Sequence, residues 1–124
     1  EKALRAGLIA SSISIERGGI ALAIAKSAMG GLLGANIDLR VIPHENINRN
    51  DTLLFSESQG RILVSIAPEN KTQFEKLCKD IPFAKIGQVT DNSLIRINAL
   101  NGNEIVSASV IDLHSAYKST FIEF

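Results

Sequence analysis

The sequence predicts an α/β (α+β) sandwich, in which helices pack on a mixed, largely antiparallel sheet of four to six strands. Several short runs alternate apolar and polar residues, as the strands of a half-buried sheet do. Residues 20–29 are rich in Ala, Leu and Ile on nearly every side, which is typical of a helix lying against a sheet. A chain of 124 residues can bury one hydrophobic core, so we expect a single domain over residues 1–124.

The first half of the chain is expected to contain two strands, one helix and a loop. These are predicted as a strand at residues 8–15, a helix at 20–29, a strand at 35–42 and a polar loop at 43–52. Gly30 and Gly31 are expected to end the helix. Alternation along the second strand puts apolar residues on one face and leaves the other face to solvent.

The second half is expected to supply most of the sheet. The predictions are a central strand at residues 61–67 that is apolar on both faces, a helix at 68–79, a hairpin of residues 83–90 and 93–100, a strand at 104–110 and a closing helix at 110–117. Asp91 and Asn92 accept the left-handed angles of a hairpin turn. The helix at 68–79 should have an inward stripe of Phe74, Leu77, Cys78 and Ile81. The apolar tail at 119–124 is expected to pack on the body or on a partner.

The charge balance excludes some classes of partner. Thirteen basic residues balance thirteen acidic ones, so no electrostatic field attracts DNA, RNA or an anionic membrane. We therefore expect neither nucleic acid nor a membrane as a partner. With 45% hydrophobic residues and a mean hydropathy of +0.15, little charge keeps the domain apart from its neighbours. We infer that part of its apolar surface is covered by something else.

The remaining composition points to a soluble intracellular protein. Cys78 is the single cysteine, which excludes an intrachain disulfide, and no apolar run approaches the length of a membrane span. The histidines, His44 and His114, lack ligand spacing, so no metal site is expected within this chain. No serine nucleophile is expected either, because the serines near residue 12 have no base beside them in the sequence. Because the sequence begins with Glu1, we expect it to be a C-terminal fragment of a longer multidomain enzyme.

One short segment carries an unusual concentration of polar groups. Residues 56–61, here called the polar corner, are Ser56, Glu57, Ser58, Gln59, Gly60 and Arg61. They combine hydroxyl, carboxylate and amide groups with a residue that lets the backbone turn and a planar cation with five donors. Such a cluster suits a polar or phosphorylated ligand. The alternative is a surface turn whose side chains bond to their own backbone.

Three segments together resemble a known enzyme family. They are LIASSISIERGGIALAIAKSAMGGLLGANIDL, then LLFSESQGRILVSI followed by a proline-led helix, and then AKIGQVTDNSLIRI. In this order they resemble the C-terminal half-domain of the aminoimidazole ribonucleotide synthetase superfamily, and within it most resemble the phosphoribosylformylglycinamidine synthase family. The ending LHSAYKSTF is similar to the family's final helix, which implies a place in the second of two repeated halves.

The resemblance implies a fold, an activity and partners. The fold would be that of the superfamily's C-terminal domain. The full-length enzyme would be an ATP-dependent C–N ligase of purine biosynthesis that uses ATP and magnesium to activate the amide oxygen of formylglycinamide ribonucleotide. Ammonia from a glutaminase would then displace phosphate to give the amidine. Implied partners are the N-terminal half-domains of the same chain, the glutaminase and a small accessory subunit, with a homodimer as a further possibility. The fragment alone would be inactive, would not bind ATP or magnesium by itself, and would be cytoplasmic.

The resemblance also marks positions for a binding site. The family's glutamate-serine-glutamine turn matches Glu57, Ser58 and Gln59, and Gly60 and Arg61 continue the match, so these residues are expected to bind substrate or nucleotide. A further match is the glycine pair entering the helix, Gly18 and Gly19, where the positive helix end favours a phosphate. A tight strand-to-helix turn is the alternative for this pair.

The chain departs from the family just before the glycine pair. Family members often carry a His-Asp-x-Ser-Asp/Glu pattern there, and residues 13–17 read ISIER, which puts Arg17 where the family tends to have an acid. This departure implies a non-catalytic half, kept for architecture or for an auxiliary nucleotide that Arg17 would help to bind. Two other interpretations stay open: a binding or assembly module, or a domain of another superfamily member of the aminoimidazole ribonucleotide synthetase, hydrogenase-maturation or selenophosphate type.

Overall fold

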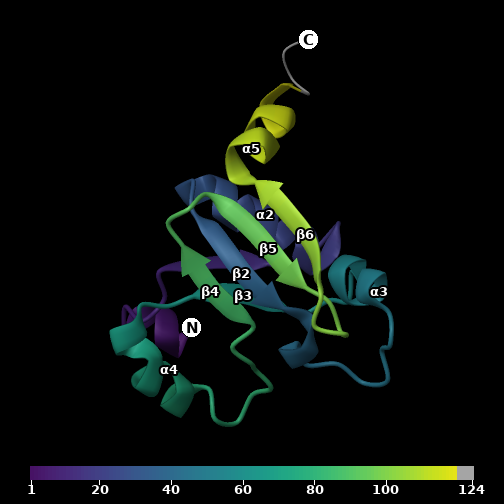
Figure 1. Cartoon of the computed structure of the whole chain (residues 1–124). Helices are drawn as coiled ribbons and strands as arrows, with labels where there is room; N and C mark the ends of the chain where they lie inside the picture. Colours follow the sequence, from purple (N-terminus) through teal and green to yellow (C-terminus); the bar gives the residue numbers. More distant parts are fainter. Residues whose placement is uncertain (120–124) are drawn as a thin grey trace.

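The computed structural model describes residues 1–119, which form five α-helices, six strands and two 3-10 turns (Figure 1). In chain order they are α1 (Lys2–Arg5), β1 (Ser11–Ser14), α2 (Gly19–Gly31), β2 (Gly34–Asp38), the 3-10 turn η1 (Leu39–Val41), α3 (Asn50–Phe55), β3 (Ile62–Ser65), the 3-10 turn η2 (Pro68–Asn70), α4 (Lys71–Leu77), β4 (Gly87–Thr90), β5 (Leu94–Asn98), β6 (Glu104–Ser109) and α5 (Val110–Ser119).

The strands form two sheets. The larger has the order β4-β2-β5-β6, in which β2 runs antiparallel to β4 and parallel to β5, and β6 runs antiparallel to β5. The smaller is the antiparallel pair β1 and β3, with Ser12 opposite Val64 and Ser14 opposite Ile62. Mixed sheets with packed helices confirm the predicted fold class, and antiparallel pairings outnumber the parallel one.

The core lies between the four-stranded sheet and helix α2, which runs behind the sheet in Figure 1. Ile20 and Ile24 of α2 are buried in one cluster with Ile37, Ile95 and Ile97 of the central strands. Alanines elsewhere on α2 let the helix lie close to its neighbours, because a small side chain adds little thickness. The predicted helix is thus confirmed, although it includes both glycines and ends at Gly31, followed by Leu32 as the C-cap with a left-handed φ of 52°.

Two predictions for residues 35–52 were wrong in detail. The strand expected to reach residue 42 ends at Asp38, because the carboxylate of Asp38 accepts the backbone N–H of Arg40 at 2.9 Å and starts the 3-10 turn. The segment predicted as a loop up to residue 52 becomes helical at Asn50. Leu53 and Leu54 are buried, so burial of these two side chains stabilises a helix that the polar residues before it do not indicate.

The strand pairing also differs from the prediction. Residues 83–90 and 93–100 do not form a hairpin, because β2 lies between β4 and β5 and pairs with both. The predicted central strand is instead β3, a member of the two-stranded sheet. It is not apolar and buried on both faces: Ile62 is 64% exposed and the other three residues of β3 are half-buried.

The helix predicted at residues 68–79 is shorter and less buried than expected. It begins as a 3-10 turn at Pro68 and its α-helical part ends at Leu77, so residue 81 cannot share the inward face of the helix. Of the predicted stripe only Cys78 is buried, Phe74 is half-buried, and Leu77 and Ile81 are exposed. The closing helix at 110–117 is confirmed as α5. Apart from residue 119, the predicted apolar tail lies outside the described residues.

Candidate functional site

Helix α3 brings the polar corner against the start of α2. Contacts between α2 and α3 place residues 56–61 beside the turn that leads from β1 into α2. The Oε1 atom of Glu57 accepts the backbone N–H of Gly18, the N-cap residue of α2, at 2.9 Å. A carboxylate in this position satisfies one of the free donors of the helix start and lies at its positive end. Two segments that the sequence analysis singled out separately therefore meet.

The glycine pair is required by this close approach. Gly18 and Gly19 have φ angles of 79° and 62°, in the left-handed region that side chains disfavour. A Cβ atom on Gly19 would lie 2.5 Å from the carbonyl oxygen of Leu54 and 2.8 Å from the Cα of Phe55. The N–H of Gly19 donates to the carbonyl of Glu16 at 3.0 Å. The pair thus forms the tight strand-to-helix turn, and both of its amide groups already have partners within the chain.

Within the polar corner the side chains bond mainly to each other and to the local backbone. The hydroxyls of Ser56 and Ser58 are 2.8 Å apart. The Arg61 guanidinium donates from Nε to the carbonyl of Ser58 at 3.3 Å and from Nη2 to the carbonyl of Ser56. Gly60 turns the chain with a φ of 83°. Gln59 is exposed. The corner is therefore a self-bonded turn that presents Glu57 to α2, while binding of a ligand by its residues stays a prediction.

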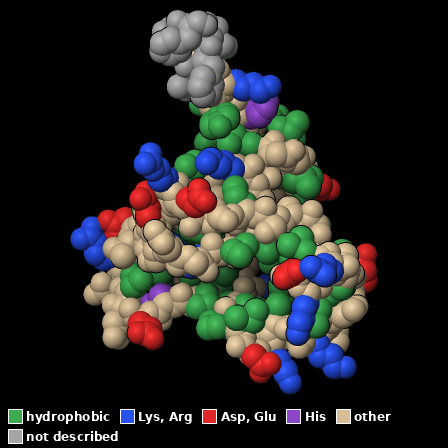
Figure 2. Space-filling model, turned by 180° about the vertical axis from the view of Figure 1, so that it is seen from behind, with side chains coloured by type: hydrophobic (Ala, Val, Ile, Leu, Met, Phe, Trp, Pro, Cys, Tyr) green, Lys and Arg blue, Asp and Glu red, His purple; other side chains and the backbone are tan. Residues whose placement is uncertain are grey.

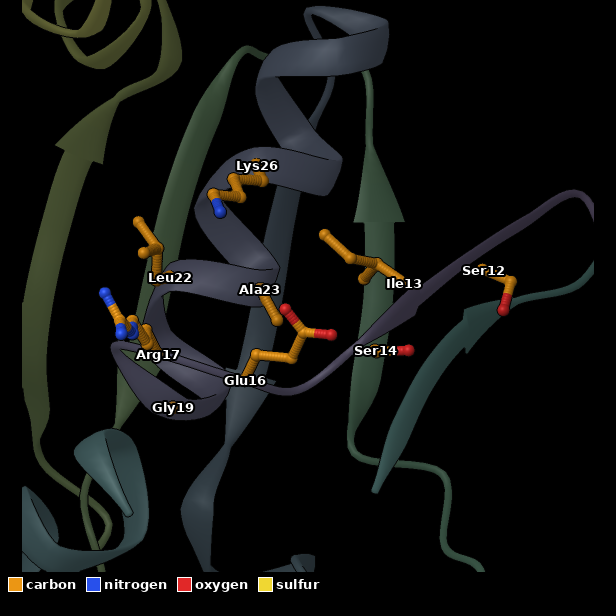
Figure 3. A pocket seen from close by; sticks show the side chains of 9 residues that line it. All are labelled: Ser12, Ile13, Ser14, Glu16, Arg17, Gly19, Leu22, Ala23 and Lys26. Carbon is orange, nitrogen blue, oxygen red and sulfur yellow. The ribbon is translucent and has the colours of Figure 1, made fainter. Parts of the chain in front are cut away.

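A hollow of about 330 Å³ lies between β1 and α2, next to the glycine turn. Its polar lining consists of Ser12, Ser14, Glu16, Arg17 and Lys26. Figure 3 shows the Glu16 carboxylate between the helix and the strand, the two serines on β1, and Arg17 on the side of Leu22. The hollow therefore has two cations and one carboxylate, which is a charge balance that suits an anionic group.

Lys26 also lines this hollow, although the sequence analysis did not select it as a site residue. It lies on α2 seven positions after Gly19, which is two helical turns along the same side. The signal was present in the sequence, since Lys26 is the only charged residue of α2. Of the predicted site residues, Arg17 and Gly19 line the hollow, whereas none of residues 56–61 does.

The face of the four-stranded sheet opposite α2 carries a second, shallower hollow. It measures about 440 Å³ and is lined by Asn36, Ile37, Asp38, Asn92, Arg96, Asn98 and Glu104. A hydrogen bond from the Arg40 side chain lowers the pKa of Asp38 below its ordinary value, and the same bond raises the pKa of Arg40. Arg49 lowers the pKa of Asp51 in the same way. These carboxylates are therefore ionised and paired at neutral pH.

The acidic groups do not assemble a metal site in the part of the chain that the structure describes. Among residues 1–119 no three His, Cys, Asp or Glu side chains come together. The carboxylate of Glu57 accepts the amide of Gly18, and Asp38 and Asp51 are paired with arginines. Magnesium needs several oxygen ligands around one point, so these residues do not fit it. Over the same residues, no helix is long and apolar enough to cross a membrane.

Curated relatives resemble nearly the whole chain. The phosphoribosylformylglycinamidine synthase subunit PurL of Methanococcus aeolicus is 37% identical over 117 residues, which are 94% of this chain and 15% of that protein. The subunit PurL of Lactobacillus acidophilus is 36% identical over 118 residues, 95% of this chain and 14% of that protein. The chain thus spans about one seventh of the length of these relatives.

Structural and family comparisons agree on the fold. The structure of Thermotoga maritima PurL complexed with ADP matches with a TM-score of 0.80 and 22% identity, over 91% of this chain and 20% of that one. The same protein complexed with ATP or with FGAR matches with a TM-score of 0.79. The family model described as AIR synthase related protein, C-terminal domain, matches residues 3–98. The chain therefore belongs to the family of AIR synthase related protein C-terminal domains.

Proposed function

We propose that this chain is the C-terminal domain of an ATP-dependent ligase of purine biosynthesis, of the phosphoribosylformylglycinamidine synthase type. The observation that carries the proposal is the 36–37% identity with PurL subunits over about 95% of this chain. The full-length enzyme would convert formylglycinamide ribonucleotide, ammonia and ATP into formylglycinamidine ribonucleotide, ADP and phosphate. Phosphorylating the amide oxygen makes it a leaving group, which ammonia displaces, so catalysis depends on positioning and on neutralising phosphate charge.

The rest of the enzyme would supply what this chain lacks. Because the chain spans about 15% of its relatives' length, we propose that N-terminal half-domains of the same polypeptide complete the nucleotide and substrate sites. The Thermotoga structures are described as complexes with ADP, ATP and FGAR and as a PurLQS assembly. By analogy we propose a glutaminase and a small accessory subunit as partners, with a homodimer as a further assembly, in the cytoplasm. Magnesium would be held outside this chain, since its described carboxylates do not fit the ion.

We propose further that this half of the enzyme is structural or binds an auxiliary nucleotide. The amides of Gly18 and Gly19 bond to Glu57 and Glu16, so any phosphate bound near them would rely on side chains or displace Glu57. Arg17 and Lys26, in the hollow beside α2, are the cations available for this. The polar corner would either face this ligand directly or hold the ligand in position. It contains the other predicted binding residues, which are Glu57, Ser58, Gln59, Gly60 and Arg61.

The proposed activity is tested with the purified full-length protein. Formation of ADP should require formylglycinamide ribonucleotide and an ammonia source together, with one amidine formed per ADP. Absence of substrate-dependent ADP formation in a folded protein would contradict the proposal. So would ATP hydrolysis by the 124-residue chain alone, because this chain is proposed to lack the catalytic site.

A second candidate function, an assembly module without any nucleotide, is favoured by the exposed hydrophobic side chains described below. The two candidates differ in one measurement. ADP should raise the thermal unfolding midpoint of the full-length protein, and the increase should become smaller when Arg17 and Lys26 are both replaced by alanine. An unchanged increase in the double variant would favour the assembly module for this half.

A further inference from the structure

Residues 77–83 expose three large hydrophobic side chains beside α4. Leu77 is 40% exposed, Ile81 59% and Phe83 45%. Leu77 is the last residue of α4, and Ile81 and Phe83 lie between α4 and β4, on a stretch without helix or strand. Leu4 on α1, the helix that packs against α4, is 58% exposed as well. We call these four residues the α4 surface.

The α4 surface is held in its exposed position by the fold. The N–H of Ile81 donates to the carbonyl of Cys78 at 3.0 Å, and Cys78 itself is buried. The ring of Phe83 packs edge-on against the ring of Phe74, with centroids 6.0 Å apart and an interplanar angle of 88°. These contacts hold the backbone at Ile81 and the ring of Phe83 in place, so part of the entropic cost of ordering this segment is already met before a partner binds.

The composition of the surface matches that of an interface. Single exposed hydrophobic residues are common on proteins, and hydrophobic residues reach the surface elsewhere on this one too (Figure 2). Here an aromatic and two aliphatic side chains occur together within residues 77–83. Exposed charged residues flank them: Lys76, Lys79, Asp80 and Lys85. An apolar centre with a charged rim is the arrangement found in protein interfaces.

The position of the chain ends indicates what covers this surface. Figure 1 shows the N-terminus beside α4, whereas α5 extends from the opposite end of the molecule. The relatives contain a much longer polypeptide than this chain, which spans about 15% of their length. Polypeptide that precedes residue 1 would emerge directly next to the α4 surface. We propose that the α4 surface docks this preceding part of the same polypeptide and so fixes the domain to its neighbour.

The docking proposal rests on the proposed function, because it requires the longer polypeptide. It is tested by cysteine labelling of the full-length protein in its native state, with the modified peptides identified by mass spectrometry. The Ile81→Cys variant probes the α4 surface. The Ile111→Cys variant on α5 is the matched control, because it replaces the same residue type at 60% exposure at the opposite end of the molecule. We expect the thiol of the Ile81→Cys variant to react with a maleimide at least tenfold more slowly than that of the Ile111→Cys variant, and the two rates to become equal in urea.

Each other result overturns the docking proposal. Equal native rates that match the rates in urea would show that the α4 surface is open. Protection that disappears on dilution would indicate a second copy of the chain, and protection that requires an added glutaminase would indicate a separate subunit. Amide hydrogen exchange of residues 77–86 in the unmodified protein gives the same information without a substitution, and fast exchange there would also contradict docking.

A parallel assay separates this proposal from the proposed function. Substrate-dependent ADP formation is measured on the same Ile81→Cys preparation. Activity together with fast labelling would overturn docking alone. Slow labelling without any activity in the unmodified enzyme would overturn the proposed function alone.

Discussion

Replacing Gly19 with alanine tests how the start of α2 is built. The φ of Gly19 is 62°, and a Cβ atom there would lie 2.5 Å from the carbonyl oxygen of Leu54 and 2.8 Å from the Cα of Phe55. Both are backbone atoms of α3, and backbone atoms cannot relieve an overlap by a change of rotamer as the end of a long side chain can. Alanine would therefore force either the turn or the end of α3 to move, and the polar corner with it.

The expected loss of stability in Gly19→Ala has two parts. An alanine in the left-handed region costs about 1–2 kcal/mol, and an overlap within a packed region costs about 1–3 kcal/mol more. We therefore expect Gly19→Ala to lower the free energy of unfolding by about 2–5 kcal/mol. Two controls isolate these parts. Gly60→Ala, at a φ of 83° with no atom within 4 Å, should lose only the first part, about 1–2 kcal/mol. Gly30→Ala, in α2 with open space and no positive φ, should gain up to about 1 kcal/mol.

Equilibrium unfolding in urea, followed by circular dichroism, measures all three variants against the unmodified chain. The midpoints should fall in the order Gly30→Ala, unmodified chain, Gly60→Ala, Gly19→Ala. If Gly19→Ala were as stable as Gly60→Ala, α2 and α3 would not approach as closely as described, and the argument for the glycine turn would be refuted.

Two further predictions concern charged side chains. Glu57→Ala should lower stability by about 1 kcal/mol and speed hydrogen exchange of the Gly18 amide, with Glu57→Gln between it and the unmodified chain; unchanged exchange would contradict the Glu57 bond. The carboxylate of Asp38 has its pKa lowered by Arg40 and therefore contributes stability above its ordinary value of 3.8, which is lost as pH falls below 3.8. The stability difference between the unmodified chain and Asp38→Asn should therefore shrink in acid, and a difference that stays constant would contradict the pairing.

Local patterns were sufficient for the elements that depend on local contacts. The run of Ala, Leu and Ile at residues 20–29 predicted α2, and the apolar stripe of residues 110–117 predicted α5. Side-chain spacing was enough to predict both helices, and α2 also buries one face, whereas Val110 is the only buried residue of α5. The fold class followed in the same way, because short alternating runs next to an apolar helix admit few other layer arrangements.

Contacts between distant segments could not be predicted in this way. The turn residues Asp91 and Asn92 indicated a hairpin, but β2 inserts between β4 and β5, and no local signal specifies that pairing. Helix α3 is short, and its formation depends on burying Leu53 and Leu54 against α2. A helix of this length is unstable alone, so its sequence carries only a weak signal.

The candidate site, too, could be predicted only where it depends on local sequence. The residue types of the polar corner and of the glycine pair were conspicuous in the sequence. That Glu57 bonds to Gly18, 39 positions away, follows from the packing of α3 on α2 and appears only in the folded chain. The contact also changes how the glycine pair is interpreted, because it occupies an amide that had been expected to be open to a phosphate.

The central proposal is that this chain is the non-catalytic half of a purine-pathway ligase. Turnover of the full-length enzyme carrying Arg17→Ala and Glu57→Ala together, with formylglycinamide ribonucleotide, ATP and ammonium chloride, tests it most directly. The account predicts that the folded double variant keeps most of its turnover number. A loss of a hundredfold or more, with circular dichroism unchanged, would place these residues in the catalytic site and contradict the account.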